Sequence, residues 1–321
     1  MQNSIGFSLW LDFIERDFVK SGKLKELIDR GVIDGATSNP AIFANSILTS
    51  EAYKSDIEKF KSEGLEPKEI YERLAIEDIK LSAEELLPLY KEGRRGFVSL
   101  EIDPFLADNV EASIEEGVRL YSELNYPNVM IKVPATDAGY KIMEELVAKD
   151  INVNATLIFS MKEAISCAEA IKRGQKRAEK VTAQTVLSIF VSRLDKATSS
   201  QTFGIVNSNM IYKEVMERGY KNTTVLFAST GVKDPELPEH YYVEQLMANE
   251  TINTAPLKTI EAFEKANIEV KNNLPLSQST VTETLRAVSS SYSPPKVLTD
   301  LKKDGLVAFE NSFRDILEYL K

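Results

Sequence analysis

The feature that most constrains the fold of this 321-residue chain is a regular alternation between short apolar runs and longer segments of helical period. Eight runs are rich in apolar and β-branched residues, which is typical of buried strands. They span residues 8–13, 32–38, 96–102, 128–133, 151–159, 183–191, 223–229 and 251–254. Because each intervening helix carries the chain back to begin the next strand, the alternation predicts a parallel sheet. Eight such strands favour an α/β fold of the (β/α)8 TIM-barrel type.

Two stretches add helices beyond those that a minimal barrel needs. Residues 44–92, between the second and third strands, form a long insertion with several amphipathic segments. Residues 256–321 form a C-terminal extension whose last segment has one apolar face. The residues of that face are Leu306, Phe309, Phe313, Ile316, Leu317 and Leu320. The SSSYSPP stretch at 289–295 predicts a loop and not a domain linker, so we expect one barrel domain over residues 1–321.

The charge balance argues against several kinds of partner. A net charge of −10 and a pI near 5.0 do not suit a protein that holds nucleic acid or an anionic membrane, since both need a basic surface. No apolar run reaches the roughly 18 residues that cross a bilayer, and residues 1–17 lack the basic start of a signal peptide. We therefore expect a cytoplasmic protein, a monomer or a homodimer, without nucleic-acid or membrane partners.

The cysteine and histidine counts argue against much of the usual catalytic chemistry. The only cysteine, Cys167, lies in a segment of helical period, so neither an internal disulfide nor a thiolate zinc site is expected. The only histidine, His240, lies in a stretch rich in Pro and Glu that predicts a surface loop. Lysine, carboxylate and hydroxyl side chains remain to carry any chemistry.

Polar residues stand near the carboxyl ends of nearly all the predicted strands, where barrel enzymes carry their chemistry. These residues are Asp12, Ser38, Asn39, Glu101, Lys132, Asn154, Thr156, Ser188 and Ser229. On the fifth strand the period of two separates a polar face from an apolar face. The polar face is Asn152, Asn154 and Thr156, and the apolar face is Val153, Ala155 and Leu157. Each polar residue alone has a structural explanation as a cap or a turn, but their coincidence favours a site.

Lys132 is the most unusual of these residues, because it interrupts the otherwise apolar run Val129–Val133. Burial disfavours the ammonium form of a lysine, so a buried lysine needs a compensating role. One role is a structural ion pair with Asp12 or Glu101. The other is attack of the neutral amine on a carbonyl carbon, which is Schiff-base catalysis. Physical chemistry alone leaves both open and slightly favours the ion pair.

Four segments carry a resemblance to a known family. They are GATSNPAIF (35–43), VMIKVPATDAGYKIMEEL (129–146), INVNATLIFS (151–160) and LSIFVSRLD (187–195). With these segments the chain resembles the transaldolase family, and the resemblance extends from residue 8 to residue 256. Ser38 stands where threonine is usual in the first motif, and Tyr140 stands where an aliphatic residue is usual in the second.

The resemblance implies a (β/α)8-barrel transferase of the pentose phosphate pathway that uses no cofactor and no metal. Its sugar phosphate substrates would be sedoheptulose 7-phosphate and glyceraldehyde 3-phosphate, and transfer of a dihydroxyacetone unit would give erythrose 4-phosphate and fructose 6-phosphate. By motif, Lys132 would form the Schiff base, and Glu101 with Thr156 would handle the water lost and regained. Asp12 would accept the proton of the C4 hydroxyl as the C3–C4 bond breaks.

The resemblance also implies the residues that bind the substrate. Asn39 and Asn154 would bind hydroxyls of the three-carbon unit, with Ser188 orienting it. Arg193 would bind the phosphate, since a guanidinium fork suits that anion. Further contacts are expected from Ser229 and Lys233. In the shorter, better-known branch of the family a Ser-x-Arg motif follows the seventh strand, whereas this chain reads ASTGVKD at 228–234, so Lys233 either replaces the arginine or is a solvated loop lysine.

Two other functions fit parts of the sequence. A transaldolase-like fructose 6-phosphate aldolase would release free dihydroxyacetone. Such enzymes have shorter chains than this one, and they carry Gln and Tyr at the positions of Glu101 and Phe190. A non-catalytic barrel that binds phosphosugars would need the pocket but no nucleophile. The presence of Lys132 together with Asp12 and Glu101 argues against that alternative.

Overall fold

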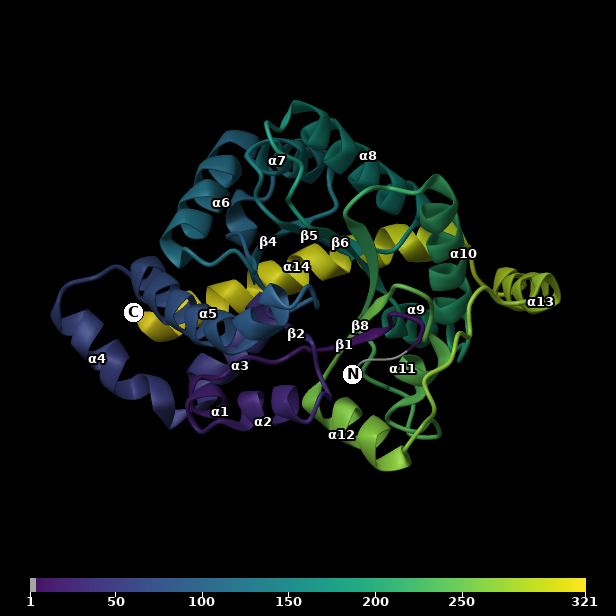
Figure 1. Ribbon diagram of the computed structural model, residues 1–321, viewed down its shortest axis with the longest axis horizontal. Coiled ribbons are helices and arrows are strands. Elements are labelled where there is room, and N and C mark those ends of the chain that lie inside the picture. The colour runs from purple at the N-terminus through teal and green to yellow at the C-terminus, as the bar shows by residue number, and fades with distance from the viewer. Residues whose placement is uncertain (1–3) are drawn as a thin grey trace.

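The computed structural model describes residues 4–321; residues 1–3, part of the stretch in which no signal peptide is expected, lie outside the described residues. Eight parallel strands form a closed barrel in sequence order (Figure 1). The strands are β1 Ser8–Leu11, β2 Gly35–Thr37, β3 Phe97–Glu101, β4 Val129–Pro134, β5 Val153–Ile158, β6 Thr185–Phe190, β7 Thr223–Ala228 and β8 Ile252–Ala255. Each overlaps one of the eight predicted runs, so the predicted (β/α)8 barrel is confirmed.

Helices surround this barrel and include both predicted additions. The insertion between β2 and β3 holds most of α3, the 3₁₀ turn η1, α4 and α5, and the C-terminal extension holds α12, α13 and α14. The α-helices are α1 Arg16–Lys20, α2 Lys23–Asp29, α3 Pro40–Thr49, α4 Lys54–Ser62, α5 Pro67–Lys91, α6 Val110–Leu124, α7 Asp137–Ala148, α8 Met161–Arg177, α9 Ser192–Thr198, α10 Phe203–Arg218, α11 Tyr241–Gln245, α12 Leu257–Ala266, α13 Gln278–Ser289 and α14 Pro294–Leu320. The 3₁₀ turns are η1 Glu51–Tyr53 and η2 Pro104–Leu106. Among the helices of residues 4–321, none is long and apolar enough to cross a membrane.

The barrel interior is apolar at one end and polar at the other. Buried apolar side chains from six strands meet in a single cluster near the amino ends of the strands. These side chains are Trp10, Phe97, Met130, Val186, Leu226 and Ile252. Their sequence neighbours Leu9, Val98 and Ile131 belong to a separate cluster, as expected when alternate residues face opposite sides of the sheet. The barrel is therefore closed by packing below the polar residues that stand nearer the strand ends.

A β-bulge interrupts the regular alternation of β5. The pairing of β5 with β6 shifts register between Ala155 and Ile158, and Leu157 has a φ of +55°. Leu157 packs in the cluster that contains Phe159 and Phe190 and not in the cluster of Val153 and Ala155. The prediction that Leu157 shares the face of Val153 and Ala155 is therefore wrong, because the bulge turns this residue out of the period of two.

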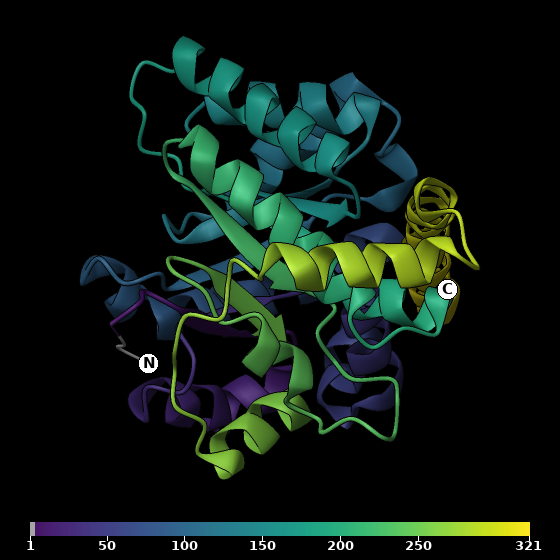
Figure 2. The ribbon, with the colours of Figure 1, turned by 90° about the vertical axis from the view of Figure 1, so that its right-hand side faces the viewer.

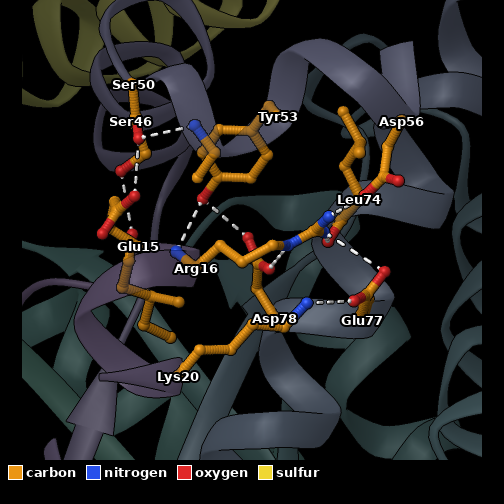
Figure 3. A network of polar contacts seen from close by, with 12 residues as sticks. Glu15, Arg16, Lys20, Ser46, Ser50, Tyr53, Asp56, Leu74, Glu77 and Asp78 are labelled. Atoms are coloured by element: carbon orange, nitrogen blue, oxygen red, sulfur yellow. Dashed lines mark hydrogen bonds and ion pairs between the residues drawn. The ribbon is translucent and has the colours of Figure 1, made fainter. Parts of the chain in front are cut away.

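Arg16, at the start of α1, is buried and bound by residues of the helical insertion (Figure 3). Its Nε donates a hydrogen bond to Asp78 Oδ1 at 2.7 Å, and its Nη1 donates to Asp56. The Tyr53 hydroxyl donates to Asp78 Oδ2 at 2.8 Å and accepts from the Arg16 backbone N–H at 3.1 Å. A buried charge is tolerated only when it is paired, so this network ties the loop after β1 to η1, α4 and α5. That loop begins with Asp12.

Helix α14 runs across one end of the barrel (Figure 1) and is seen nearly end-on at one side of the molecule in Figure 2. It contacts α3, α9, η2 and the end of β5. Because these segments follow the carboxyl ends of β2, β6 and β3, α14 lies over the C-terminal end of the barrel. Phe309, Phe313, Ile316 and Leu320 are buried, which confirms the apolar face predicted for this segment.

Candidate active site

The carboxyl ends of the strands enclose a cavity of about 280 Å³. Its lining includes six of the predicted site residues and several side chains that the sequence did not single out. The six predicted residues are Asp12, Asn39, Lys132, Ser188, Arg193 and Ser229. Parallel pairing also aligns two further predicted residues with Lys132, since Glu101 of β3 and Asn154 of β5 are its register partners. Residues far apart in the sequence thus meet at one end of the barrel.

Lys132 reaches the cavity from β4, with only 6% of its side chain exposed. Its Nζ donates a hydrogen bond to the backbone oxygen of Ser38 at 2.9 Å. Glu101 Oε2 lies 3.8 Å from Nζ, which is within ion-pair distance but too long for a hydrogen bond. The amine is therefore held by one carbonyl and one nearby carboxylate in a desolvated position.

Glu101 and Thr156 lie on β3 and β5, the strands on either side of the strand of Lys132, and both are buried outside the cavity lining. Within the described part of the chain, Glu101 Oε2 and Thr156 Oγ1 are buried without a hydrogen-bond partner. Burial raises the pKa of Glu101 to about 7, against the opposing effect of the Lys132 charge and with a further increase from Asp12. A carboxyl group with this pKa can both donate and accept a proton near neutral pH.

Asp12 follows β1 and faces the cavity. Its Oδ1 accepts a hydrogen bond from Thr37 Oγ1 at 2.6 Å, and that hydroxyl lies 2.7 Å from Thr254 Oγ1. Burial raises the pKa of Asp12, while Lys132, the hydrogen bond from Thr37 and Arg193 act in the opposite direction. The carboxylate is thus oriented by β2 and is a stronger base than a solvated aspartate.

Two predicted asparagines are fixed by their neighbours: Asn39 lines the cavity, whereas Asn154 is fully buried behind the lining residue Ser188. Ser188 Oγ donates to Asn154 Oδ1 at 2.7 Å, and Asn154 Nδ2 lies 3.3 Å from Ser99 Oγ. Asn39 caps α3, since its Oδ1 accepts the Ile42 backbone N–H at 3.0 Å. The Asn-Pro pair at 39–40 favours this helix start, because proline is well suited to the first helical position.

Arg193 enters the cavity from the first turn of α9, directly after β6. Its guanidinium carbon lies 5.1 Å from the centre of the Phe190 ring, a stacked position. Burial lowers the pKa of Arg193, and Asp12 and Asp304 oppose this shift. Ser229, after β7, also lines the cavity.

The structure does not bring Lys233 into the cavity lining. This exposed lysine lines a neighbouring hollow of about 610 Å³ together with Lys196 and Ser192. The two hollows adjoin, because the Ser192 hydroxyl lies 3.3 Å from that of Ser229.

Sequence reasoning missed several cavity residues. Thr37 orients Asp12 and is itself hydrogen-bonded to Thr254, and the positions of these threonines at the ends of β2 and β8 are a signal that could have identified them. Phe13 and Phe309 line the cavity as well. No pattern near Phe309 indicates a site, because it reaches the cavity only through the path of α14 across the barrel.

Neither sulfur nor imidazole takes part in the site. Cys167 is buried in α8 and His240 precedes α11, and neither lines the cavity. Among residues 4–321, no group of three or more histidine, cysteine or acidic side chains is arranged to hold a metal ion.

A desolvated amine and two carboxyl groups, gathered at the C-terminal end of a closed (β/α)8 barrel, define the protein as a barrel enzyme. The family described as transaldolase/fructose-6-phosphate aldolase matches residues 9–320. The chain belongs to this family.

Curated relatives agree with this assignment over their full lengths. A transaldolase of Campylobacter jejuni subsp. jejuni serotype O:23/36 is 44% identical over 329 residues, covering 98% of this chain and 99% of the relative. Transaldolases of Helicobacter pylori strains Shi470 and P12 are 42% and 41% identical, and each alignment covers 97% of this chain and 98% of the relative.

Proposed function

We propose that this enzyme is a transaldolase of the cytoplasmic pentose phosphate pathway. It moves a dihydroxyacetone unit from sedoheptulose 7-phosphate to glyceraldehyde 3-phosphate, giving erythrose 4-phosphate and fructose 6-phosphate. The observation that carries the proposal is the desolvated Lys132 amine, 3.8 Å from Glu101, at the end of a polar cavity. The names and full-length similarity of the relatives support it.

The first step forms the covalent bond. The neutral amine of Lys132 attacks C2 of the ketose, and the C2 oxygen leaves as water after receiving a proton. Glu101 supplies and later removes that proton, and the Thr156 hydroxyl orients the water. A pKa of about 7 suits this use of Glu101, because it gives both protonation states a substantial population near neutral pH.

The second step breaks the carbon chain. Asp12 accepts the proton of the C4 hydroxyl, the C3–C4 bond breaks, and its electron pair moves into the iminium to give an enamine on Lys132. The aldose erythrose 4-phosphate then leaves. The enamine carbon C3 attacks the aldehyde of glyceraldehyde 3-phosphate, Asp12 returns its proton to the new hydroxyl, and water releases fructose 6-phosphate from Lys132.

The remaining polar residues bind the substrate. Asn154, held by Ser188, and Asn39 bind the hydroxyls of the three-carbon unit. Arg193 and Ser229 bind the phosphate at the outer wall of the cavity. Lys233 in the adjoining hollow completes the phosphate site, which requires its exposed side chain to turn toward Ser229.

A trapping experiment tests the proposed function. The protein is incubated with fructose 6-phosphate, reduced with borohydride and digested, and its peptides are mapped by mass spectrometry. We expect a three-carbon adduct on Lys132, because reduction converts the Schiff base to a stable amine. An untreated portion of the same protein preparation, assayed for erythrose 4-phosphate-dependent formation of sedoheptulose 7-phosphate, distinguishes transfer from simple aldol cleavage. An unmodified Lys132 peptide from active protein contradicts the mechanism.

An Arg193→Ala variant is expected to lose affinity for phosphorylated substrates selectively. We expect KM for fructose 6-phosphate to rise about 10- to 100-fold, since a hydrogen bond to a charged group contributes roughly 1.5–3 kcal/mol. KM for unphosphorylated fructose should change little. The matched control is Arg286→Ala, which removes an exposed arginine of α13. Equal increases for both sugars exclude Arg193 from the phosphate site.

A further inference from the structure

Helix α14 closes one side of the reaction cavity, although it is the last element of the chain and lies outside the eightfold repeat. Lys302 Nζ donates a hydrogen bond to the backbone oxygen of Ala135, directly after β4, at 2.6 Å. The same ammonium lies 3.4 Å from Glu163 Oε1 in α8, and its side chain is only 13% exposed. The helix is therefore anchored beside the strand that carries Lys132.

Gly305 lets α14 approach the strand ends closely. A Cβ added at this buried glycine would lie 2.9 Å from Leu157 Cδ2 and 3.5 Å from Arg193 Nη1. Leu157 is the residue that the β5 bulge turns toward this region, so the bulge and the glycine fit together. Any larger residue at 305 pushes α14 away from the cavity or displaces Leu157.

One helical turn after Gly305, α14 places Phe309 in the cavity wall. Phe309 is 5% exposed and packs in the cluster that contains Leu157 and Phe190. It lines the same cavity as Lys132, Asp12 and Arg193. The next apolar residue of the helix, Phe313, packs between Tyr71 of α5 and Phe105 of η2. The packing of Gly305 and of Phe313 therefore fixes the helix on either side of Phe309.

We propose that Phe309 is a specificity-determining residue that favours transfer over hydrolysis by excluding water from the enzyme-bound three-carbon unit. This inference rests on the function proposed above. After the first aldose leaves, the enamine waits for its acceptor. Hydrolysis competes: C3 takes a proton, water adds to C2 of the resulting iminium, and the C2–N bond breaks. These steps release free dihydroxyacetone and restore the Lys132 amine.

An aromatic ring suits this role because it fills space and offers water no strong hydrogen bond. Truncation to alanine creates room next to the intermediate for added water, which takes about 30 Å³ per molecule in the liquid. Polar residues elsewhere in the wall bind the sugar hydroxyls, so they cannot exclude water equally well. Phe309 thus affects whether the enzyme-bound intermediate is transferred or hydrolysed, and not how fast the intermediate forms.

The test measures the ratio of free dihydroxyacetone to transferred product, with fructose 6-phosphate as donor and erythrose 4-phosphate as acceptor. For Phe309→Ala we expect this ratio to rise about tenfold, equivalent to about 1.4 kcal/mol between the two barriers. Phe309→Leu, which keeps most of the apolar volume, should raise it much less and should fold even if the alanine variant does not. Val307→Ala, on the exposed face of α14, is the matched control.

The outcomes separate this inference from the proposed function. If the unaltered protein forms neither the Lys132 adduct nor transferred product, the proposed function fails. If it forms both and the ratio in the folded Phe309 variants equals that of Val307→Ala, Phe309 does not control the partition. A lower yield of borohydride adduct with an unchanged ratio also overturns the inference, because it assigns Phe309 to formation of the intermediate.

Discussion

A Lys132→Met variant is expected to lose transfer activity by more than about 10⁴-fold, because removal of a covalent nucleophile leaves only binding and orientation. Methionine keeps an unbranched apolar side chain of similar length, so the packing between β3 and β5 should persist. Steady-state formation of sedoheptulose 7-phosphate from fructose 6-phosphate and erythrose 4-phosphate measures the loss. The variant should also give no borohydride adduct. Lys141→Met, at an exposed position of α7, is the control and should keep full activity.

The same variant distinguishes the two roles that remain open for a buried lysine. If Lys132 serves only as the ion-pair partner of Glu101, its removal strands a buried carboxylate and lowers stability. In that case the folded fraction of Lys132→Met should stay active, and adding Glu101→Gln should restore stability. If Lys132 is the nucleophile, Lys132→Met stays inactive even where it is fully folded. Activity within about tenfold of the unaltered protein in either variant contradicts the proposed mechanism.

A Glu101→Gln variant is expected to lose activity while gaining stability at neutral and alkaline pH. Loss of a proton-transferring group should lower kcat by about 10²- to 10⁴-fold. The stability gain follows from burial, which raises the pKa of Glu101 from an ordinary value of 4.5 to about 7. The folded protein therefore binds this proton more tightly than the unfolded chain does, and ionisation of Glu101 opposes folding.

The raised pKa of Glu101 determines the pH range over which the substitution changes stability. Below about pH 4.5 the carboxyl is protonated in both states, so the substitution should leave the free energy of unfolding nearly unchanged. Between pH 4.5 and 7 the unaltered protein loses stability relative to the variant, and above pH 7 the difference levels off at about 3 kcal/mol. Urea unfolding at pH 4.5 and pH 8 measures it. Glu115→Gln, on an exposed position of α6, should show no such dependence, and an equal effect in both variants refutes the argument.

The loss of activity and the gain in stability of Glu101→Gln would together explain why the barrel contains features that oppose its folding. Glu101 Oε2 and the Thr156 hydroxyl are buried without hydrogen-bond partners within residues 4–321, and the β5 bulge places Leu157, the residue after Thr156, in a left-handed conformation. Each feature opposes folding. Their occurrence together on β3 and β5, the two strands that flank β4 and Lys132, is expected of a site whose polar groups are arranged for a substrate and not for the free protein.

Prediction from the sequence succeeded where local pattern decides structure. All eight strands were located because buried parallel strands are short apolar runs between helices, and in the structure the register of β3, β4 and β5 places Glu101, Lys132 and Asn154 side by side. It failed at Leu157, because a bulge depends on contacts with β6 and α14 that lie far away in the sequence. It also missed the network of Arg16, which joins α1 to the insertion (Figure 3).

The sequence by itself determined the barrel, the alternation that directs polar residues to one end of it, and the family motifs around Lys132. These features depend on residue period and on neighbours along the chain. Only the tertiary structure decided which residues share the cavity. It placed Thr37 and Thr254 beside Asp12, left Lys233 in an adjoining hollow, and brought Phe309 from α14 into the wall. The physical reason is that these contacts arise from close packing between distant segments, and a single sequence carries no local signal of which segments meet.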